Sequence, residues 1–96
     1  MPRQTQDFGQ RVSAARQALM SIRIEMEGFI QDIGGATSKP KQIADTAAVQ
    51  LGLLDWVESS RSVRRMADIE WAIVELNNQI ANKRGDWVRL RARLRR

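Results

Sequence analysis

The chain lacks three side chains on which protein chemistry most often depends: it has no cysteine, no histidine and no tyrosine among 96 residues. Without cysteine it has neither a disulfide framework nor a thiolate metal site. Without histidine, the commonest general base and the usual imidazole metal ligand are also missing. No glycine-rich phosphate loop replaces them. The sequence therefore predicts a protein that is not an enzyme and that uses no cofactor, metal or small-molecule substrate.

Long apolar runs are also missing. The longest stretch without a charged residue covers residues 46–54, whereas a membrane-spanning helix needs about 20 apolar residues. The first residues contain no apolar stretch of the signal-peptide type. We therefore expect a soluble protein that resides in the cytoplasm, or an intracellular viral product.

The first third of the chain carries an apolar pattern with alternating spacings of four and three residues. Its eight members are Phe8, Val12, Ala15, Leu19, Ile22, Met26, Phe29 and Ile33. This heptad spacing is typical of a helix that buries one narrow face against another helix. It predicts a helix over residues 7–33. Two glycines follow, and they favour a helix end and a loop over residues 34–40.

A similar pattern runs through the last third of the chain, in which Lys83 is the single polar member. The pattern comprises Met66, Ile69, Ile73, Leu76, Ile80, Lys83, Trp87, Leu90 and Leu94. It predicts a long helix over residues 56–93, starting at a capping box formed by Asp55 and Glu58. Gly85 is the place where this helix can bend. A shorter helix over residues 41–53 would precede it.

The final residues also fit a second interpretation, because residues 88–95 alternate strictly between apolar and basic side chains, as in a half-buried strand. The heptad register crosses Gly85 without a shift, and no other segment offers a partner strand. We therefore favour a helix that continues to about Arg93, and we keep a strand over residues 88–95 as the alternative.

These patterns predict a single all-α domain over residues 1–96. Two long helices would form an antiparallel hairpin with their apolar faces together, and the short third helix would lie between them as in a three-helix bundle. We expect Trp71 to pack under the short helix and Trp56 to pack near the turn. The last helix is the longer one, so its end would overhang the hairpin and leave three residues for a homo-oligomer or a docked protein: Trp87, Leu90 and Leu94.

The net charge of +5 arises entirely from the carboxyl-terminal segment. Residues 1–82 contain nine basic and ten acidic side chains, whereas residues 83–96 contain seven basic side chains and one acidic side chain. Arginine predominates, and its planar fork suits phosphates and carboxylates. The candidate binding residues are Arg84, Arg89, Arg91, Arg93, Arg95 and Arg96.

Three kinds of ligand suit these arginines: nucleic-acid phosphates, an acidic protein surface, and an anionic membrane surface, which is the least favoured. The plain alternative is a solvated end that only confers solubility. A helix-turn-helix motif fits poorly, because Ala48 and Gly52 would place Glu58 where the motif needs an apolar residue. We expect a binding and assembly module that contacts nucleic acid without sequence specificity. The alternatives are an adaptor or inhibitor of the kind that phages and mobile elements encode, docking an acidic protein surface, and a structural subunit of a larger assembly.

Overall fold

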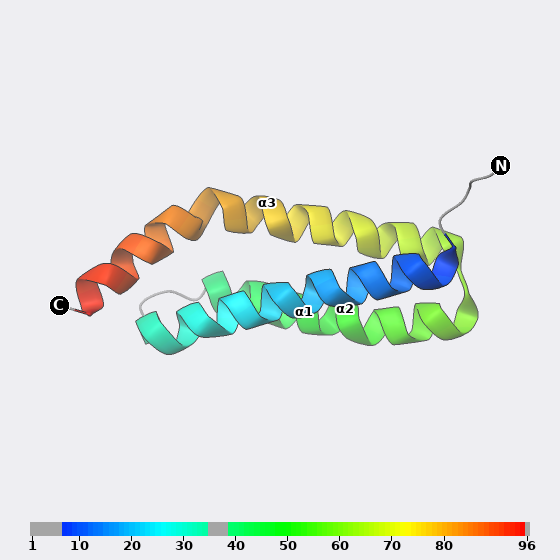
Figure 1. The fold of residues 1–96 in the computed structure, drawn as a ribbon, viewed down its shortest axis with the longest axis horizontal. Coiled ribbons are helices and arrows are strands. Elements are labelled where there is room, and N and C mark those ends of the chain that lie inside the picture. The colour runs from blue at the N-terminus through cyan, green and yellow to red at the C-terminus, as the bar shows by residue number, and fades with distance from the viewer. Residues whose placement is uncertain (1–6, 35–38, 96) are drawn as a thin grey trace.

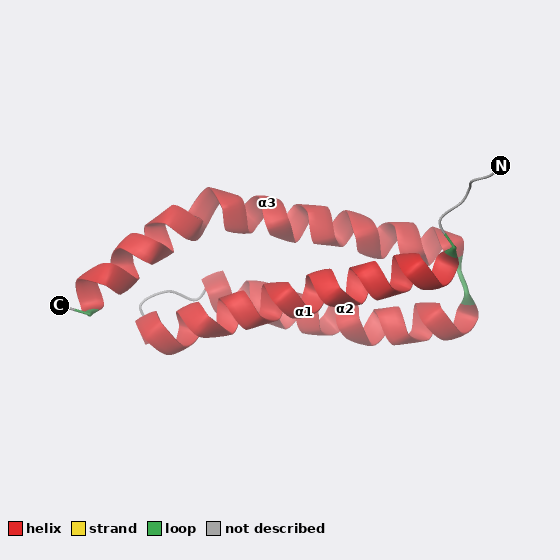
Figure 2. Ribbon diagram, in the orientation of Figure 1, coloured by secondary structure: helices red, strands yellow, loops and turns green. Residues whose placement is uncertain are grey.

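The computed structural model describes residues 7–34 and 39–95, which form three helices and, within those ranges, no strand. They are α1 (Phe8–Ile33), α2 (Lys39–Ser60) and α3 (Val63–Leu94) (Figures 1 and 2). The all-α prediction is confirmed. The helices form an elongated bundle of about 55 × 25 × 15 Å.

Local capping sets both ends of α1. The Asp7 carboxylate accepts a hydrogen bond from the backbone N–H of Gly9 at 2.6 Å, and so satisfies a free donor of the first turn. At the other end Gly34 adopts φ 57° and donates its N–H to the Ile30 carbonyl. This left-handed conformation favours glycine, so the helix ends at Ile33, as the sequence predicts.

The prediction for the second helix was wrong at its carboxyl end, since α2 continues past Gly52 and Asp55 to Ser60. Leu54 and Val57 lie on the buried face of α2, with 0% and 2% of their surface exposed. Burying two such side chains outweighs the cost of a glycine inside a helix, which is about 1 kcal/mol. Asp55 is therefore not a helix cap.

The predicted start of the third helix at residue 56 was also wrong. Because α2 continues to Ser60, α3 begins only at Val63. Arg61 adopts φ 57° in the turn between the two helices. The Ser62 hydroxyl then accepts a hydrogen bond from the Arg65 backbone N–H at 3.2 Å and caps α3. This cap is a single serine in a polar stretch, a weaker sequence signal than the acidic pair at residues 55 and 58.

Interhelix ion pairs show that α1 and α3 run parallel, which contradicts the predicted antiparallel hairpin. Arg11 binds Glu70 and Glu25 binds Arg84, and both pairs are separated by 59 positions. Because the two pairs have the same sequence separation at both ends of the bundle, α1 and α3 run in the same direction (Figure 1). The reason is the length of α2, whose 22 residues span about 33 Å and carry the chain back along the bundle.

The core lies along α1, which packs against both other helices, while α2 and α3 contact each other least. Seven of the eight apolar residues of the first pattern are buried, and Phe8 is half-buried against the core. The opposing buried residues come from both α2 and α3. They are Pro40, Ile43, Ala44, Ala47, Leu54, Val57, Met66, Ile69, Leu76, Ile80 and Trp87.

The end of α3 packs against the end of α1. Part of the segment that was predicted to overhang the bundle is therefore buried within the chain. Figure 1 shows α3 changing direction in its orange part, in the region where Gly85 lies in the sequence. Trp87 is 4% exposed, and its ring centroid lies 5.4 Å from that of Phe29. Leu90 is half-buried against the same core. The prediction that Trp87 and Leu90 lack a partner within the chain was therefore wrong, and of the three residues Leu94 alone is exposed, at 54%.

The strand interpretation of residues 88–95 is also wrong, because α3 remains helical to Leu94. Its cap at Arg95 donates a backbone N–H to the Arg91 carbonyl at 3.2 Å. Helix continuation is favoured because it places both Trp87 and Leu90, which are three positions apart, on the core side. A strand would have left its backbone groups without partners.

Candidate interaction surfaces

Most of the predicted carboxyl-terminal arginines form ion pairs within the chain. Arg84 donates two hydrogen bonds to the Glu25 carboxylate, at 2.6 and 3.0 Å. These bonds raise the pKa of the Arg84 guanidinium above its ordinary value. Asp32 of α1 lies 3.5 Å from an Arg91 nitrogen and 3.2 Å from an Arg95 nitrogen.

The other predicted arginines have different surroundings. Arg89 pairs with Asp86, three positions earlier on the same helix. Arg93 is exposed and forms no ion pair among residues 7–34 and 39–95. Arg96 lies outside the described residues.

The structure therefore gives Arg84, Arg91 and Arg95 a role that the sequence did not reveal, which is to fasten the end of α3 to α1. Arg91 adds a cation–π contact, since its guanidinium carbon lies 4.8 Å from the centroid of the Phe29 ring. Their carboxylate partners, Glu25 and Asp32, lie about 60 positions away along the chain, so no local pattern could have identified them. Ion pairs as exposed as these contribute about 0–1 kcal/mol each.

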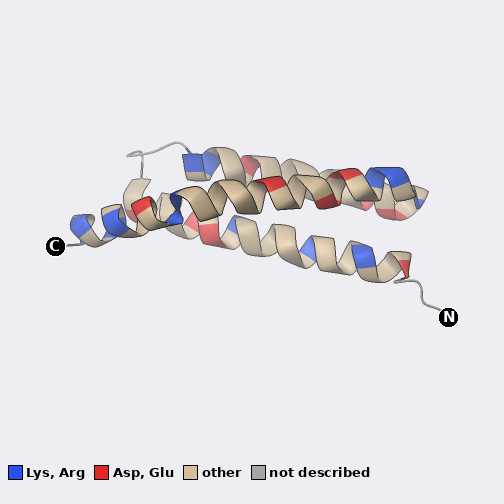
Figure 3. Ribbon diagram, turned by 90° about the horizontal axis from the view of Figure 1, so that it is seen from above, with Lys and Arg blue, Asp and Glu red and all other residues tan. Residues whose placement is uncertain are grey.

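A basic groove remains at this end of the bundle. Lys39, Lys83 and Arg93 line a groove of about 570 Å³ together with Asp86, Trp87 and Leu90. Figure 3 shows basic residues on the last turns of α3 and on the first turn of α2, at the same end of the molecule. Sequence reasoning missed Lys39 and Lys83 as members of this site, because the fold alone joins them.

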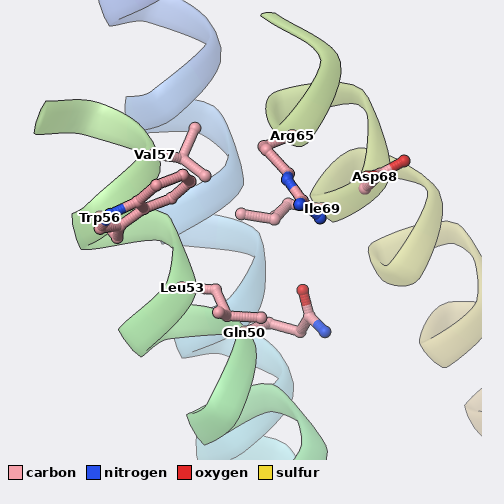
Figure 4. Close-up of a pocket in the computed structure, with 7 residues that line it drawn as sticks. All are labelled: Gln50, Leu53, Trp56, Val57, Arg65, Asp68 and Ile69. Carbon is pink, nitrogen blue, oxygen red and sulfur yellow. The ribbon is translucent and has the colours of Figure 1, made fainter. Parts of the chain in front are cut away.

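A second groove, of about 350 Å³, lies between α2 and α3 at the opposite end. Leu53, Trp56 and Val57 line it from α2, and Ile69 extends toward them from α3 (Figure 4). Trp56 is 57% exposed and Leu53 is 48% exposed. We call this the apolar groove, and its polar lining residues are Gln50, Arg65 and Asp68.

The face of α3 that points away from the other helices carries a second series with alternating spacings of four and three. All its members are exposed: Ala67, Trp71, Val74, Asn78, Ala81, Gly85, Val88 and Ala92. We call this series the outer stripe. The exposed fractions of Trp71, Val74 and Val88 are 64%, 46% and 41%. The prediction that Trp71 packs under α2 was wrong, because α2 contacts a different face of α3.

The part of the chain that the structure describes contains no cluster of three or more potential metal-ligand side chains. None of its three helices has a stretch apolar and long enough to traverse a bilayer. No protein-family model, curated protein or solved structure matches this chain.

Proposed function

We propose that this protein is a non-enzymatic assembly module that binds another protein through the apolar groove and the outer stripe. The observation that carries this proposal is the exposure of two of the three tryptophans, Trp56 and Trp71, while the third is buried. The bundle folds around its core without using them.

The arrangement of the exposed apolar residues supports this proposal more than their number does. Single exposed apolar residues are normal on protein surfaces. Here Leu53 and Trp56 line one groove, and Trp71, Val74 and Val88 share one face of one helix. Tryptophan is enriched among the residues that contribute most to protein interfaces, at roughly 2 kcal/mol or more each. Both surfaces therefore suit a helix or an apolar side chain of a partner.

A photo-crosslinking amino acid tests this proposal when it replaces Trp56 or Trp71, one at a time, in the full chain. Gln17 is the matched control, because it is exposed on α1 away from both surfaces. We expect a discrete crosslinked protein species at position 56 or 71, in purified protein or in the producing cell, and none at position 17. Absence of a discrete product at both tryptophan positions would overturn the proposal.

The basic groove favours a second function, the binding of a polyanion such as nucleic acid without sequence specificity. Lys39, Lys83 and Arg93 converge there with one carboxylate, Asp86. Titration with random duplex DNA at two salt concentrations tests this function. We expect the affinity to fall steeply as salt rises, because bound phosphates release counterions.

Arg93→Gln should weaken this binding at low salt, since it removes one phosphate contact. Ser13→Ala is the control, because Ser13 is exposed on α1 outside this groove. Affinity that is unchanged by salt and by Arg93→Gln would count against the polyanion function and would leave the protein-binding proposal standing.

A further inference from the structure

We propose that the outer stripe of α3 pairs with the outer stripe of a second copy of this chain, with the two helices antiparallel. This inference rests on the proposed function and names its partner. It follows from the sizes of the side chains along the stripe, the shape of α3 and the charges on either side.

The sizes of the stripe residues match the curvature of the helix. Figure 1 shows that α3 is convex on the side away from α1 and α2, so a second convex helix contacts it most closely along its middle part. Small side chains occupy that part of the stripe, at Ala81 and Gly85. Larger ones lie on either side of that part, at Trp71 and Val74 before it and at Val88 after it.

The surroundings of Gly85 suggest that its small size serves the approach of a helix from a second molecule. A Cβ atom added at Gly85 would meet only the guanidinium of Arg89, at 3.5 Å, which is ordinary contact with a flexible side chain. Gly85 does not adopt a positive φ either. Packing within the chain therefore does not require a glycine here, whereas close packing of two helix backbones favours one.

The charges on the two sides of the stripe select the antiparallel orientation. Beside the stripe, the charged side chains that make no ion pair with α1 are Asp68 and Glu75 in the first half of α3 and Arg89 in the second half. Parallel helices in register would bring the acidic positions together and the basic positions together. Antiparallel helices bring each acidic half opposite a basic half, which favours this orientation.

One antiparallel register satisfies both the stripe and the charges. When Trp71 lies opposite Val88 of the second copy, Val74 lies opposite Gly85 and Asn78 opposite Ala81. Beside them, Asp68 lies opposite Arg89. By the two-fold symmetry each contact occurs twice.

The charged pair at the edges of this register is available for such a contact. Asp68 is exposed and makes no ion pair among residues 7–34 and 39–95. Arg89 has a side chain that is 72% exposed, and its ion-pair partner is Asp86 on its own helix. Asn78 lies beside the two-fold axis, where one polar residue specifies the register of a helix pair at some cost in stability.

Analytical ultracentrifugation of the full chain over a range of concentrations tests whether the dimer forms. We expect the wild-type chain to dimerise and Trp71→Ala to raise the dissociation constant by about tenfold or more, as truncation of a large aromatic residue at an interface does. Ile24→Ala is the control, because Ile24 is 68% exposed on α1 and outside the stripe. A wild-type chain that stays monomeric, or a Trp71→Ala variant that dimerises as tightly as wild type, would overturn the inference.

Charge reversal tests the orientation. Asp68→Arg places two arginines opposite each other in the proposed register, and Arg89→Asp places two aspartates opposite each other. Each single variant should weaken the dimer, and the double variant should restore it. Circular dichroism checks that each variant is folded. A double variant that dimerises no better than the singles would overturn the antiparallel register.

The two proposals fail in distinguishable ways. A monomeric wild-type chain whose crosslinker at position 71 captures a different protein would overturn this inference and leave the proposed function standing. A monomeric chain without a crosslinked product at either tryptophan position would overturn both.

Discussion

The two long faces of α3 share one heptad periodicity but differ in burial and in the size of their side chains. The inner face buries Met66, Ile69, Leu76, Ile80 and Trp87 against the bundle. The outer stripe has the same heptad spacing, yet half of its residues are alanine or glycine and all of them are exposed. A heptad spacing therefore indicates that a face can meet another helix. The volume of the side chains on that face determines how much their packing contributes to the free energy of unfolding.

The tryptophans give the largest expected contrast between the two faces. Trp87→Ala should lower the free energy of unfolding by about 3–5 kcal/mol, because it leaves a cavity beside Phe29. Trp71→Ala should change it by about 0.5 kcal/mol or less, since Trp71 is 64% exposed. Denaturant unfolding at low protein concentration measures both values without a contribution from self-association. Equal losses would mean that the two faces are not distinguished by burial.

The arginines offer a smaller contrast on the same helix. Arg91→Gln should cost about 1 kcal/mol, because it removes both the contact with the Phe29 ring and the pairing with Asp32. Arg93→Gln should leave the free energy of unfolding unchanged within about 0.5 kcal/mol, since Arg93 is exposed. Thermal unfolding of the two variants side by side makes the comparison. A larger loss at Arg93 would show that the end of α3 is fastened differently.

Two glutamates on α3 give the smallest contrast, which depends on pH. The hydrogen bonds from Arg11, above all, lower the pKa of Glu70 below its ordinary value of 4.5, although partial burial opposes the shift. The unfolded chain then binds this proton more readily than the folded chain. The stability that Glu70 contributes is therefore present above about pH 4.5 and is lost as the pH falls through the lowered pKa of the folded state.

Glu70→Gln should accordingly lower the melting temperature at neutral pH, and its difference from wild type should shrink below about pH 4.5. Glu75→Gln is the control, because Glu75 is exposed and forms no ion pair among the described residues. Melting temperatures measured from neutral to acid pH give both curves. A difference at Glu70 that does not change with pH would contradict the role of the Arg11 pair.

How much of the fold could be predicted depended on how much of each helix is determined locally. The ends of α1 agree with the predicted range, because the Asp7 cap and the Gly34 stop act only on the first and last turns. The end of α2 does not, because Asp55 and Glu58 imitate a capping box while both bind Arg16 of α1. The helix continues past that point because it buries Leu54 and Val57.

The candidate site was predictable only in its composition. The excess of arginine near the carboxyl end was evident from the sequence, and so was the apolar spacing that contains Trp87. The carboxylates that neutralise these arginines, Glu25 and Asp32, lie on another helix. Trp71 and Val74 lie outside the inner pattern in the sequence, and the prediction that the short helix covers Trp71 was wrong because spacing alone does not show which faces of a helix are covered.

The amino-acid sequence by itself determined that this chain forms helices, because periodic apolar spacing and the absence of strand partners depend on neighbours within a few turns. Only the tertiary structure decided that α1 and α3 run parallel, that most of the carboxyl-terminal arginines are paired within the chain, and that one apolar face of α3 is filled while the other stays open. These outcomes depend on the length of α2 and on contacts between residues about 60 positions apart. Such contacts exist only once the core has aligned the helices.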